Sequence, residues 1–276
     1  MFSSPLLSGL TGEVKGLRIG VLKESFEKGM ADPVTTQKVL EAAKELEKAG
    51  AQVKEVSFPY LKQAFSAYYT IAMAEASSNL ARFDGVKYGY RADNYEDLND
   101  LYCRSRSEGF GTEVKKRILL GTTVLSGGYY DEYYLKAMKI RNAVRRELDR
   151  IFTGTDLLLT PTAPGTAPLA GSGVSDPVSV YYSDVFTVFA NLAGLPSVSF
   201  PCGTGENGMP AGAQFTGRAA DDGLVLNAVH VFQLRTDWHM SGISLPACRE
   251  SKPVHGHGTA EKNFRMISVP QESDGE

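Results

Sequence analysis

Residues 16–58 read GLRIGVLKESFEKGMADPVTTQKVLEAAKELEKAGAQVKEVSF and show the order strand, helix, strand. In the first seven of these residues the side chains alternate, and Leu17, Ile19 and Val21 fall on one side. Alternation of this kind predicts a strand with one buried face. A second strand is predicted over 52–58. Short connections between the three elements favour parallel pairing of the strands, so we predict an α/β fold in which helices cover a sheet.

The helix between the two strands has clear signals at both ends. Asp32 is a good N-cap residue, and Pro33 suits the first turn. Val39 and Leu46 recur at helical spacing, and Gly50 can end the helix in the left-handed conformation. The segment from 33 to 49 is therefore predicted to be an amphipathic helix.

The rest of the chain contains more helices and three more strands. Helical periodicity predicts helices over 60–80, 95–106, 112–125, 131–152, 182–192 and 222–234. Short apolar runs predict strands over 156–161, 197–200 and 212–216, the first of them fully buried. Because a Gly-rich segment, 203–208, joins the last two strands, we predict a hairpin turn there rather than a phosphate-binding loop.

The composition excludes some classes of protein. Of 276 residues, 42% are hydrophobic and 22% are charged, which supports a buried core and excludes a wholly disordered chain. Lys and Arg number 29 against 32 for Asp and Glu, so the net charge is −3. Proteins that bind nucleic acids usually carry a basic excess. We therefore expect no direct binding of RNA or DNA.

The cysteines and histidines indicate neither disulfides nor a metal site. Cys103, Cys202 and Cys248 are an odd number at wide spacing, unlike a disulfide framework or a CxxC metal clip. His255 and His257 have no further ligand at a metal-binding spacing. No apolar run approaches the ~18 residues that a membrane span requires. These features favour a reducing, cytoplasmic setting away from membranes.

Two charged residues are candidates for ligand binding. Arg117 lies at the margin of the apolar stripe of a predicted helix, where its guanidinium could clamp a carboxylate. Asp184 begins another predicted helix, where an acid complements the dipole or could meet an ammonium group. From spacing alone, Arg117 could equally be an ordinary surface arginine and Asp184 an ordinary aspartate at a helix start.

Several motifs resemble a known family. Three segments resemble the A subunit of glutamyl-tRNA(Gln)/aspartyl-tRNA(Asn) amidotransferases: EASSNLARFDGVKYGYR (75–91), SEGFGTEVKKRILLGT (107–122) and SGGYYDEYY (126–134). Three others resemble the wider amidase signature family: LTPTAP (159–164), NLAGLP (191–196) and MPAGAQF (209–215). The resemblance implies an α/β fold with a mixed β-sheet flanked by helices on both faces.

The resemblance extends over residues 12–239 but lacks one part of the family pattern. No segment like the Gly/Ser-rich GGSSGGS signature, which in the family holds the Ser-Ser-Lys catalytic residues, exists in this chain. We therefore expect a carboxy-terminal portion of an amidase-signature domain, without catalytic residues. Residues 240–276 do not match, and with Phe264 as their sole aromatic residue they are expected to be a disordered tail.

The resemblance also implies a chemistry. In the family a serine attacks the side-chain amide of glutamine, and the released ammonia passes to a partner protein, which uses ATP and Mg to activate a mischarged tRNA. By resemblance, Arg117 would bind the carboxylate of glutamine, Asp184 its α-ammonium group, and Tyr68 would line the pocket. No cofactor is expected on this chain, and its partners would be the B and C subunits. Alone, the chain is expected to be inactive.

One departure from the family and two alternative functions remain. Phe189 stands where the family commonly has proline, so the helix after Asp184 could continue unbroken. The first alternative is a fragment of a general amidase, which the segments 75–91 and 126–134 disfavour. The second is a noncatalytic amino-acid-binding module.

Overall fold

The βαβ unit predicted from residues 16–58 is present in the computed structural model, which describes residues 6–168, 181–206 and 208–240. Strand β1 (Arg18–Leu22) pairs in parallel with β2 (Gln52–Val56), with Arg18 opposite Gln52. A 3₁₀ turn, η2 (Lys23–Phe26), follows β1, and another, η1 (Leu7–Gly9), precedes it. The parallel pairing confirms the sequence prediction.

Helix α1 (Pro33–Lys48) connects these strands and uses the predicted end signals. The carboxylate of Asp32 accepts a hydrogen bond from the backbone N–H of Thr35 at 2.7 Å, which satisfies one of the free N–H groups of the first turn. Gly50 has φ +101°, a conformation that side chains other than glycine rarely adopt. Local chemistry therefore fixes both ends of α1.

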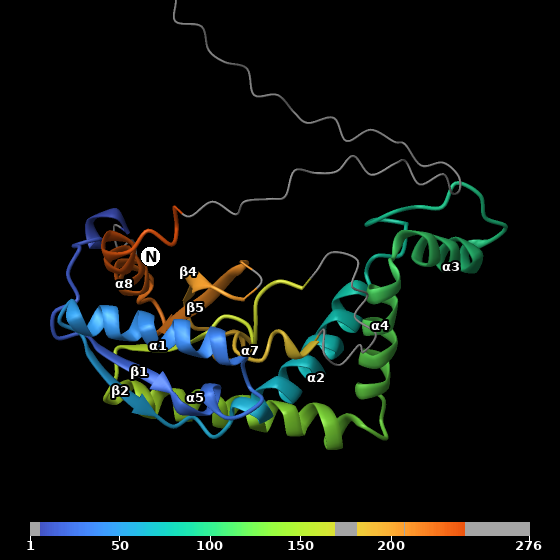
Figure 1. The fold of residues 1–276 in the computed structure, drawn as a ribbon. Helices are drawn as coiled ribbons and strands as arrows, with labels where there is room; N and C mark the ends of the chain where they lie inside the picture. The colour runs from blue at the N-terminus through green and yellow to red at the C-terminus, as the bar shows by residue number, and fades with distance from the viewer. Residues whose placement is uncertain (1–5, 169–180, 207, 241–276) are drawn as a thin grey trace, which may run out of the picture. The chain divides into compact units, whose positions relative to one another are not determined.

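Three further strands complete a mixed sheet of order β2-β1-β3-β5-β4 (Figure 1). They are β3 (Leu157–Pro161), β4 (Ser197–Thr204) and β5 (Pro210–Gly217). β1 and β3 are parallel, whereas β5 runs antiparallel to both of its neighbours, β3 and β4. The predicted hairpin is confirmed, since β4 and β5 follow one another and pair in antiparallel.

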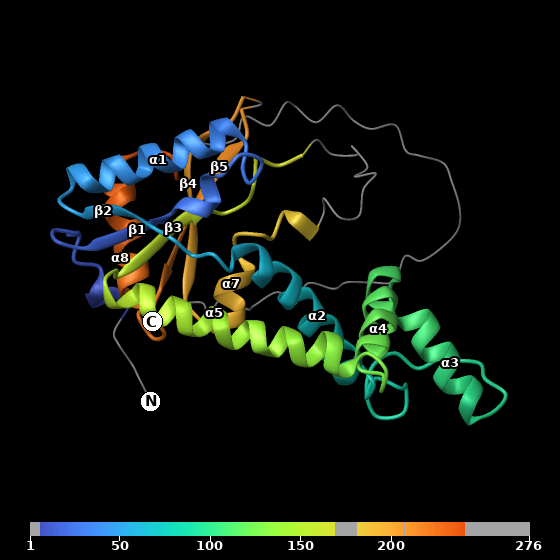
Figure 2. The ribbon, with the colours of Figure 1, turned by 90° about the horizontal axis from the view of Figure 1, so that it is seen from below.

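Helices cover both faces of the sheet (Figure 2). Helices α1 and α8 (Asp222–Arg235) pack with the sheet into one hydrophobic cluster. A second cluster is formed by α2 (Leu61–Leu80), α5 (Lys136–Thr153) and α7 (Val188–Ala193). This arrangement corrects one prediction, because β1 is buried on two faces rather than one: Ile19 faces the first cluster and Leu22 the second. Strand β3 is buried at all five residues, as predicted.

Most of residues 61–153 lie in helices close to the predicted boundaries, whereas residues 81–97 form turns and irregular structure. The elements are α2 (Leu61–Leu80), α3 (Leu98–Gly109), α4 (Thr112–Val124), a π-helical turn η3 (Tyr130–Leu135) and α5 (Lys136–Thr153). In α5, Val144 and Leu148 are buried as its apolar stripe requires. The helix predicted over 131–152 therefore begins with a π turn before it becomes regular.

The predicted helix over 182–192 is wrong in its first half. Residues 183–187 form turns, and α7 spans only Val188–Ala193. Val185 and Phe186 are adjacent and both fully buried, so this segment is anchored by neighbouring side chains rather than by one helical stripe. Phe189 is also buried, and its ring packs against Phe58 at 5.6 Å.

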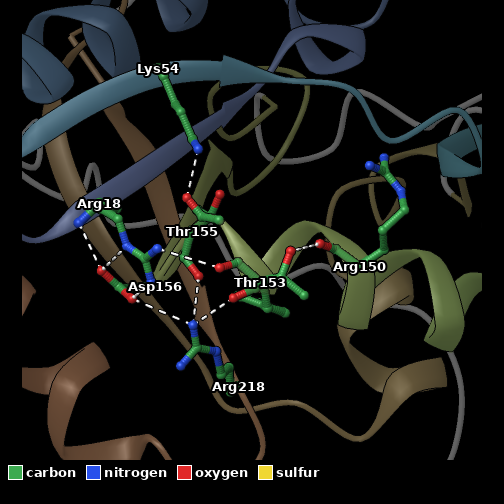
Figure 3. A network of polar contacts seen from close by, with 9 residues as sticks. Arg18, Lys54, Arg150, Thr153, Thr155, Asp156 and Arg218 are labelled. Atoms are coloured by element: carbon green, nitrogen blue, oxygen red, sulfur yellow. Dashed lines mark hydrogen bonds and ion pairs between the residues drawn. The ribbon is translucent and has the colours of Figure 1, made fainter.

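The end of α5 is held by a polar network (Figure 3). The side chains of Arg18, Lys54 and Arg218 donate hydrogen bonds to the carbonyl groups of residues 152–155 at 2.5 to 3.4 Å. Asp156 forms ion pairs with Arg18 at 2.6 Å and with Arg218 at 3.5 Å. Since the last carbonyls of a helix lack intrahelical partners and carry partial negative charge, these cations stabilise the turn from α5 into β3.

Some predictions concern residues outside the described ranges. Except for Met240, the tail predicted over 240–276 lies outside the described ranges. His255 and His257 belong to this part of the chain. The division into 12–239 and a separate tail stays a prediction. Among the residues that are described, no helix is both long enough and apolar enough to cross a bilayer.

Candidate active site

Arg117 lies on α4, and its guanidinium is held by a carboxylate one helical turn earlier. Its Nε lies 3.1 Å from Oε1 of Glu113, and the Arg117 side chain is 42% exposed. The spacing of four residues places both side chains on one face of the helix. The guanidinium is thus positioned at the surface of α4, with part of its body packed against protein.

Asp184 lies in the turn that precedes α7, not at a helix start as predicted. The turn is fixed from inside by the buried side chains of Val185 and Phe186, and the side-chain amide of Gln214 donates to the carbonyl of Phe186 at 3.1 Å. The Asp184 carboxylate itself is exposed. Tyr69 on α2 donates its hydroxyl proton to Oδ2 of Asp184 at 2.6 Å.

One chain of contacts joins these two candidate residues. The hydroxyl of Tyr181 donates to Oε1 of Glu113 at 2.5 Å, and the Tyr181 ring lies edge-on to that of Tyr69, with centroids 4.9 Å apart. Arg117 and Asp184 are therefore connected through Glu113, Tyr181 and Tyr69. Within the described ranges, no ion pair joins Arg117 directly to Asp184. The structure thus gathers a cation and an anion into one polar cluster without neutralising them against each other.

The tyrosine bonded to Asp184 is Tyr69, the neighbour of the predicted Tyr68. Tyr68 meets the Tyr69 ring edge-on at 5.2 Å and is partly buried against the cluster formed by α2, α5 and α7. The contribution of Tyr68 to a ligand pocket stays a prediction.

A hollow of about 470 Å³ lies beside the end of α5. It is lined by residues other than the three predicted site residues, among them Phe152 and Arg218.

Hydrogen bonds and burial shift the pKa values of Glu113 and the two tyrosines. The hydrogen bond from Tyr181 and then that from Arg117 lower the pKa of Glu113 below its ordinary value. Burial, followed by the bond to Asp184, raises the pKa of Tyr69, and the bond to Glu113 raises that of Tyr181. At neutral pH, Glu113 is therefore a carboxylate and both tyrosines are protonated donors.

Three residues of this cluster, Tyr69, Glu113 and Tyr181, were not among the predicted site residues. The pair of Glu113 with Arg117 could have been found, because a glutamate four residues before an arginine on a helix is a recognised signal. Tyr181 is 68 residues away from Glu113 in sequence, and Tyr69 is 115 residues away from Asp184. No local pattern points to contacts over such separations.

Ser77, Ser126 and Cys202 have structural roles. Ser77 on α2 shares a hydrogen bond with Thr122 on α4 at 2.9 Å, and Ser126 donates to the carbonyl of Thr123 at 2.7 Å. Cys202 is buried, which raises the pKa of its thiol to about 12 and makes it a poor nucleophile. Among the described residues, no group of three His, Cys, Asp or Glu side chains is placed to hold a metal ion.

Known proteins match this chain over most of its length. It is 52% identical over 232 residues to the A subunit of glutamyl-tRNA(Gln) amidotransferase from Pseudomonas fluorescens, and 53% identical over 227 residues to that from Brevibacillus brevis. These alignments cover 84% and 82% of this chain but 48% and 46% of the relatives. The chain thus spans about half the length of the curated relatives it matches.

Solved structures agree with the sequence comparison. The crystal structure of the A subunit of glutamyl-tRNA(Gln) amidotransferase from Thermotoga maritima superposes with a TM-score of 0.60 at 38% identity, over 79% of this chain and 42% of that one. A bacterial aryl acylamidase of the amidase signature family shares the fold, with a TM-score of 0.64 at 24% identity, over 85% of this chain and 46% of that chain. The family profile described as Amidase matches residues 3–226. The chain therefore belongs to the amidase family.

Proposed function

We propose that this chain is the glutamine-binding part of the A subunit of a tRNA-dependent amidotransferase. Such an enzyme releases ammonia from glutamine so that mischarged Glu-tRNA(Gln), or Asp-tRNA(Asn), can be amidated. The identity of about 50% with proteins named as the A subunit of glutamyl-tRNA(Gln) amidotransferase supports the proposal. So do the segments at 75–91, 107–122 and 126–134, which distinguish such subunits from other amidases.

The observation that carries the proposal is that two side chains of opposite charge, Arg117 and Asp184, belong to one polar cluster. Free glutamine has an α-carboxylate and an α-ammonium group, and Arg117 and Asp184 offer one complementary charge to each. Since the two residues are not ion-paired with each other, a zwitterionic ligand can bridge them. Charge-assisted hydrogen bonds of this kind are strong and directional, so they would hold the side-chain amide of glutamine in a fixed place.

Catalysis itself is assigned to residues that this sequence does not contain. We propose that a serine nucleophile from the family's Gly/Ser-rich signature attacks the glutamine amide, and that this chain contributes recognition alone. ATP and Mg would act on the partner B and C subunits, and no cofactor would bind to this chain. The isolated chain is then expected to bind glutamine without hydrolysing it.

Calorimetric titration of the 276-residue chain with L-glutamine tests the binding step. The substitution Arg117→Ala is expected to weaken binding by about tenfold or more, because a hydrogen-bonded charge is lost. The matched control is Arg104→Ala on α3, since Arg104 also donates its Nε to an acidic residue four positions earlier. Equal affinities of the two variants would contradict the assignment of Arg117.

A coupled ammonia assay tests the catalytic step on the same material. We expect no ammonia release above the uncatalysed rate from pure chain and glutamine. Steady release that is insensitive to salt would refute the assignment of catalysis to residues outside this chain. Binding of simple amides that is indifferent to Arg117→Ala would instead favour a general amidase.

A further inference from the structure

The carboxylate of Glu113 makes an unusual single-point contact with Arg117. One oxygen, Oε1, accepts from Arg117 Nε at 3.1 Å and from the Tyr181 hydroxyl at 2.5 Å. No described residue accepts a hydrogen bond from either Nη group of Arg117. Toward the described residues the guanidinium is therefore held by its Nε, and its end-on fork, formed by the two Nη groups, has no partner among them.

Two other arginine pairs among the described residues contact their carboxylates differently. Arg150 donates from both Nε and Nη2 to the carboxylate of Glu147, at 2.6 to 3.1 Å, so one of its two Nη groups is already hydrogen-bonded. Arg104 directs its Nε between both oxygens of Asp100, at 2.8 and 3.0 Å. Arg117, like Arg104, uses Nε alone, but it contacts a single carboxylate oxygen, Oε1 of Glu113, which also accepts from Tyr181.

The tyrosine that shares this oxygen also belongs to the segment that carries Asp184. The backbone carbonyl of Tyr181 accepts the N–H of Asp184 at 3.1 Å, and its ring packs on Tyr69, whose hydroxyl binds the Asp184 carboxylate. Glu113 thus ties the arginine on α4 to the turn that presents the aspartate. The hydrogen bonds of Glu113 therefore help to set the position of the Arg117 guanidinium relative to the Asp184 carboxylate.

We propose that Glu113 is a positioning residue that holds Arg117 by its Nε, so that the carboxylate of an α-amino acid meets the two Nη groups end-on. The inference rests on the proposed function for its ligand, L-glutamine. It assigns Glu113 a role through its hydrogen bonds rather than through its charge. If Glu113 merely competed with the ligand for Arg117, replacing Glu113 would instead raise the affinity for L-glutamine.

Two substitutions separate these roles by titration with L-glutamine. In Glu113→Gln the amide oxygen still accepts from Arg117 and Tyr181, so the dissociation constant is expected to stay within about threefold of wild type. In Glu113→Ala both bonds are lost, and we expect affinity to fall about tenfold or more. Tighter binding by both variants would overturn positioning in favour of competition. Unchanged binding by both would overturn any role of Glu113 in recognition.

A measurement without ligand keeps this inference distinct from the proposed function. The Nε–H signal of Arg117 in a nitrogen-15 NMR spectrum, assigned by its absence in Arg117→Lys, reports the bond to Glu113 directly. It should shift in Glu113→Ala and stay close to wild type in Glu113→Gln, and a signal indifferent to both would overturn the positioning role. If the signal behaves as expected but the wild-type chain binds no glutamine, the proposed function fails and the ligand part of this inference fails with it.

Discussion

Replacing Gly121 by alanine tests the contact that positions α4 against α2. A Cβ atom at Gly121 would lie 2.0 Å from the carbonyl oxygen of Met73 and 2.7 Å from Cβ of Ser77, whereas ordinary contacts begin at 3.4 Å. The two helices would have to separate by about 1.4 Å to relieve the first contact. A backbone carbonyl cannot rotate away as a side chain can, so the strain cannot be relaxed cheaply.

The expected loss of stability follows from two opposing effects. Overpacking at a close helix contact costs up to about 3 kcal/mol, and exchanging glycine for alanine within a helix gains about 1 kcal/mol. We therefore expect Gly121→Ala to lower the free energy of unfolding by about 2 kcal/mol, which corresponds to roughly 4–8 °C in melting temperature for a chain of this size. The hydrogen bond between Ser77 and Thr122, which spans the same contact, should be lost too.

Thermal and urea unfolding followed by circular dichroism measure this effect. The matched control is Gly223→Ala in α8, where an added Cβ meets nothing within 4 Å, so that only the helical gain of up to about 1 kcal/mol remains. Because Gly121 lies one turn after Arg117, its substitution should also weaken glutamine binding. If Gly121→Ala melted at or above the wild-type temperature, the close approach of α4 to α2 would be refuted.

Two further predictions concern titratable groups. Hydrogen bonding and charge from Arg18 lower the pKa of Asp156 in the folded state. This carboxylate therefore stabilises the fold fully above its unfolded pKa of about 3.9. The stabilisation is lost as the pH falls through the lower pKa of the folded state. Urea unfolding between pH 3 and pH 6 should show a flatter stability profile for Asp156→Asn than for the exposed control Asp149→Asn, and parallel profiles would contradict this. The thiol of Cys202, with its pKa raised to about 12, should resist alkylation at pH 8 while exposed Cys103 reacts, as peptide mass mapping would show; equal labelling would contradict the burial of Cys202.

The fold could be predicted where the signals are local. Asp32, Pro33 and Gly50 each act within one turn of the chain, and the helix they bound was predicted almost to the residue. The burial of β1 on two faces was missed because it depends on helices from distant parts of the chain. The first half of the helix predicted over 182–192 failed for a similar reason, since the packing of Phe186 overrides local propensity there.

The candidate site was predictable only in part. Arg117 and Asp184 were picked out as charged residues on predicted helices, but their roles came from resemblance to a family and stay predictions. The contacts around them depend on Tyr69 and Tyr181, which pair with acids far away in the sequence. A pattern of residues along one helix shows Glu113 beside Arg117, but it cannot show that a tyrosine from another segment shares the same oxygen.

The position of β3 in the middle of the sheet has a consequence for how the protein is made. The bond between Arg18 and Asp156 spans 138 residues, and β1 gains its second neighbour only when that much more chain has left the ribosome. At ordinary rates of translation this takes on the order of ten seconds. During that interval β1 lacks its β3 neighbour, so we expect its unpaired edge to be most open to association with other chains during synthesis.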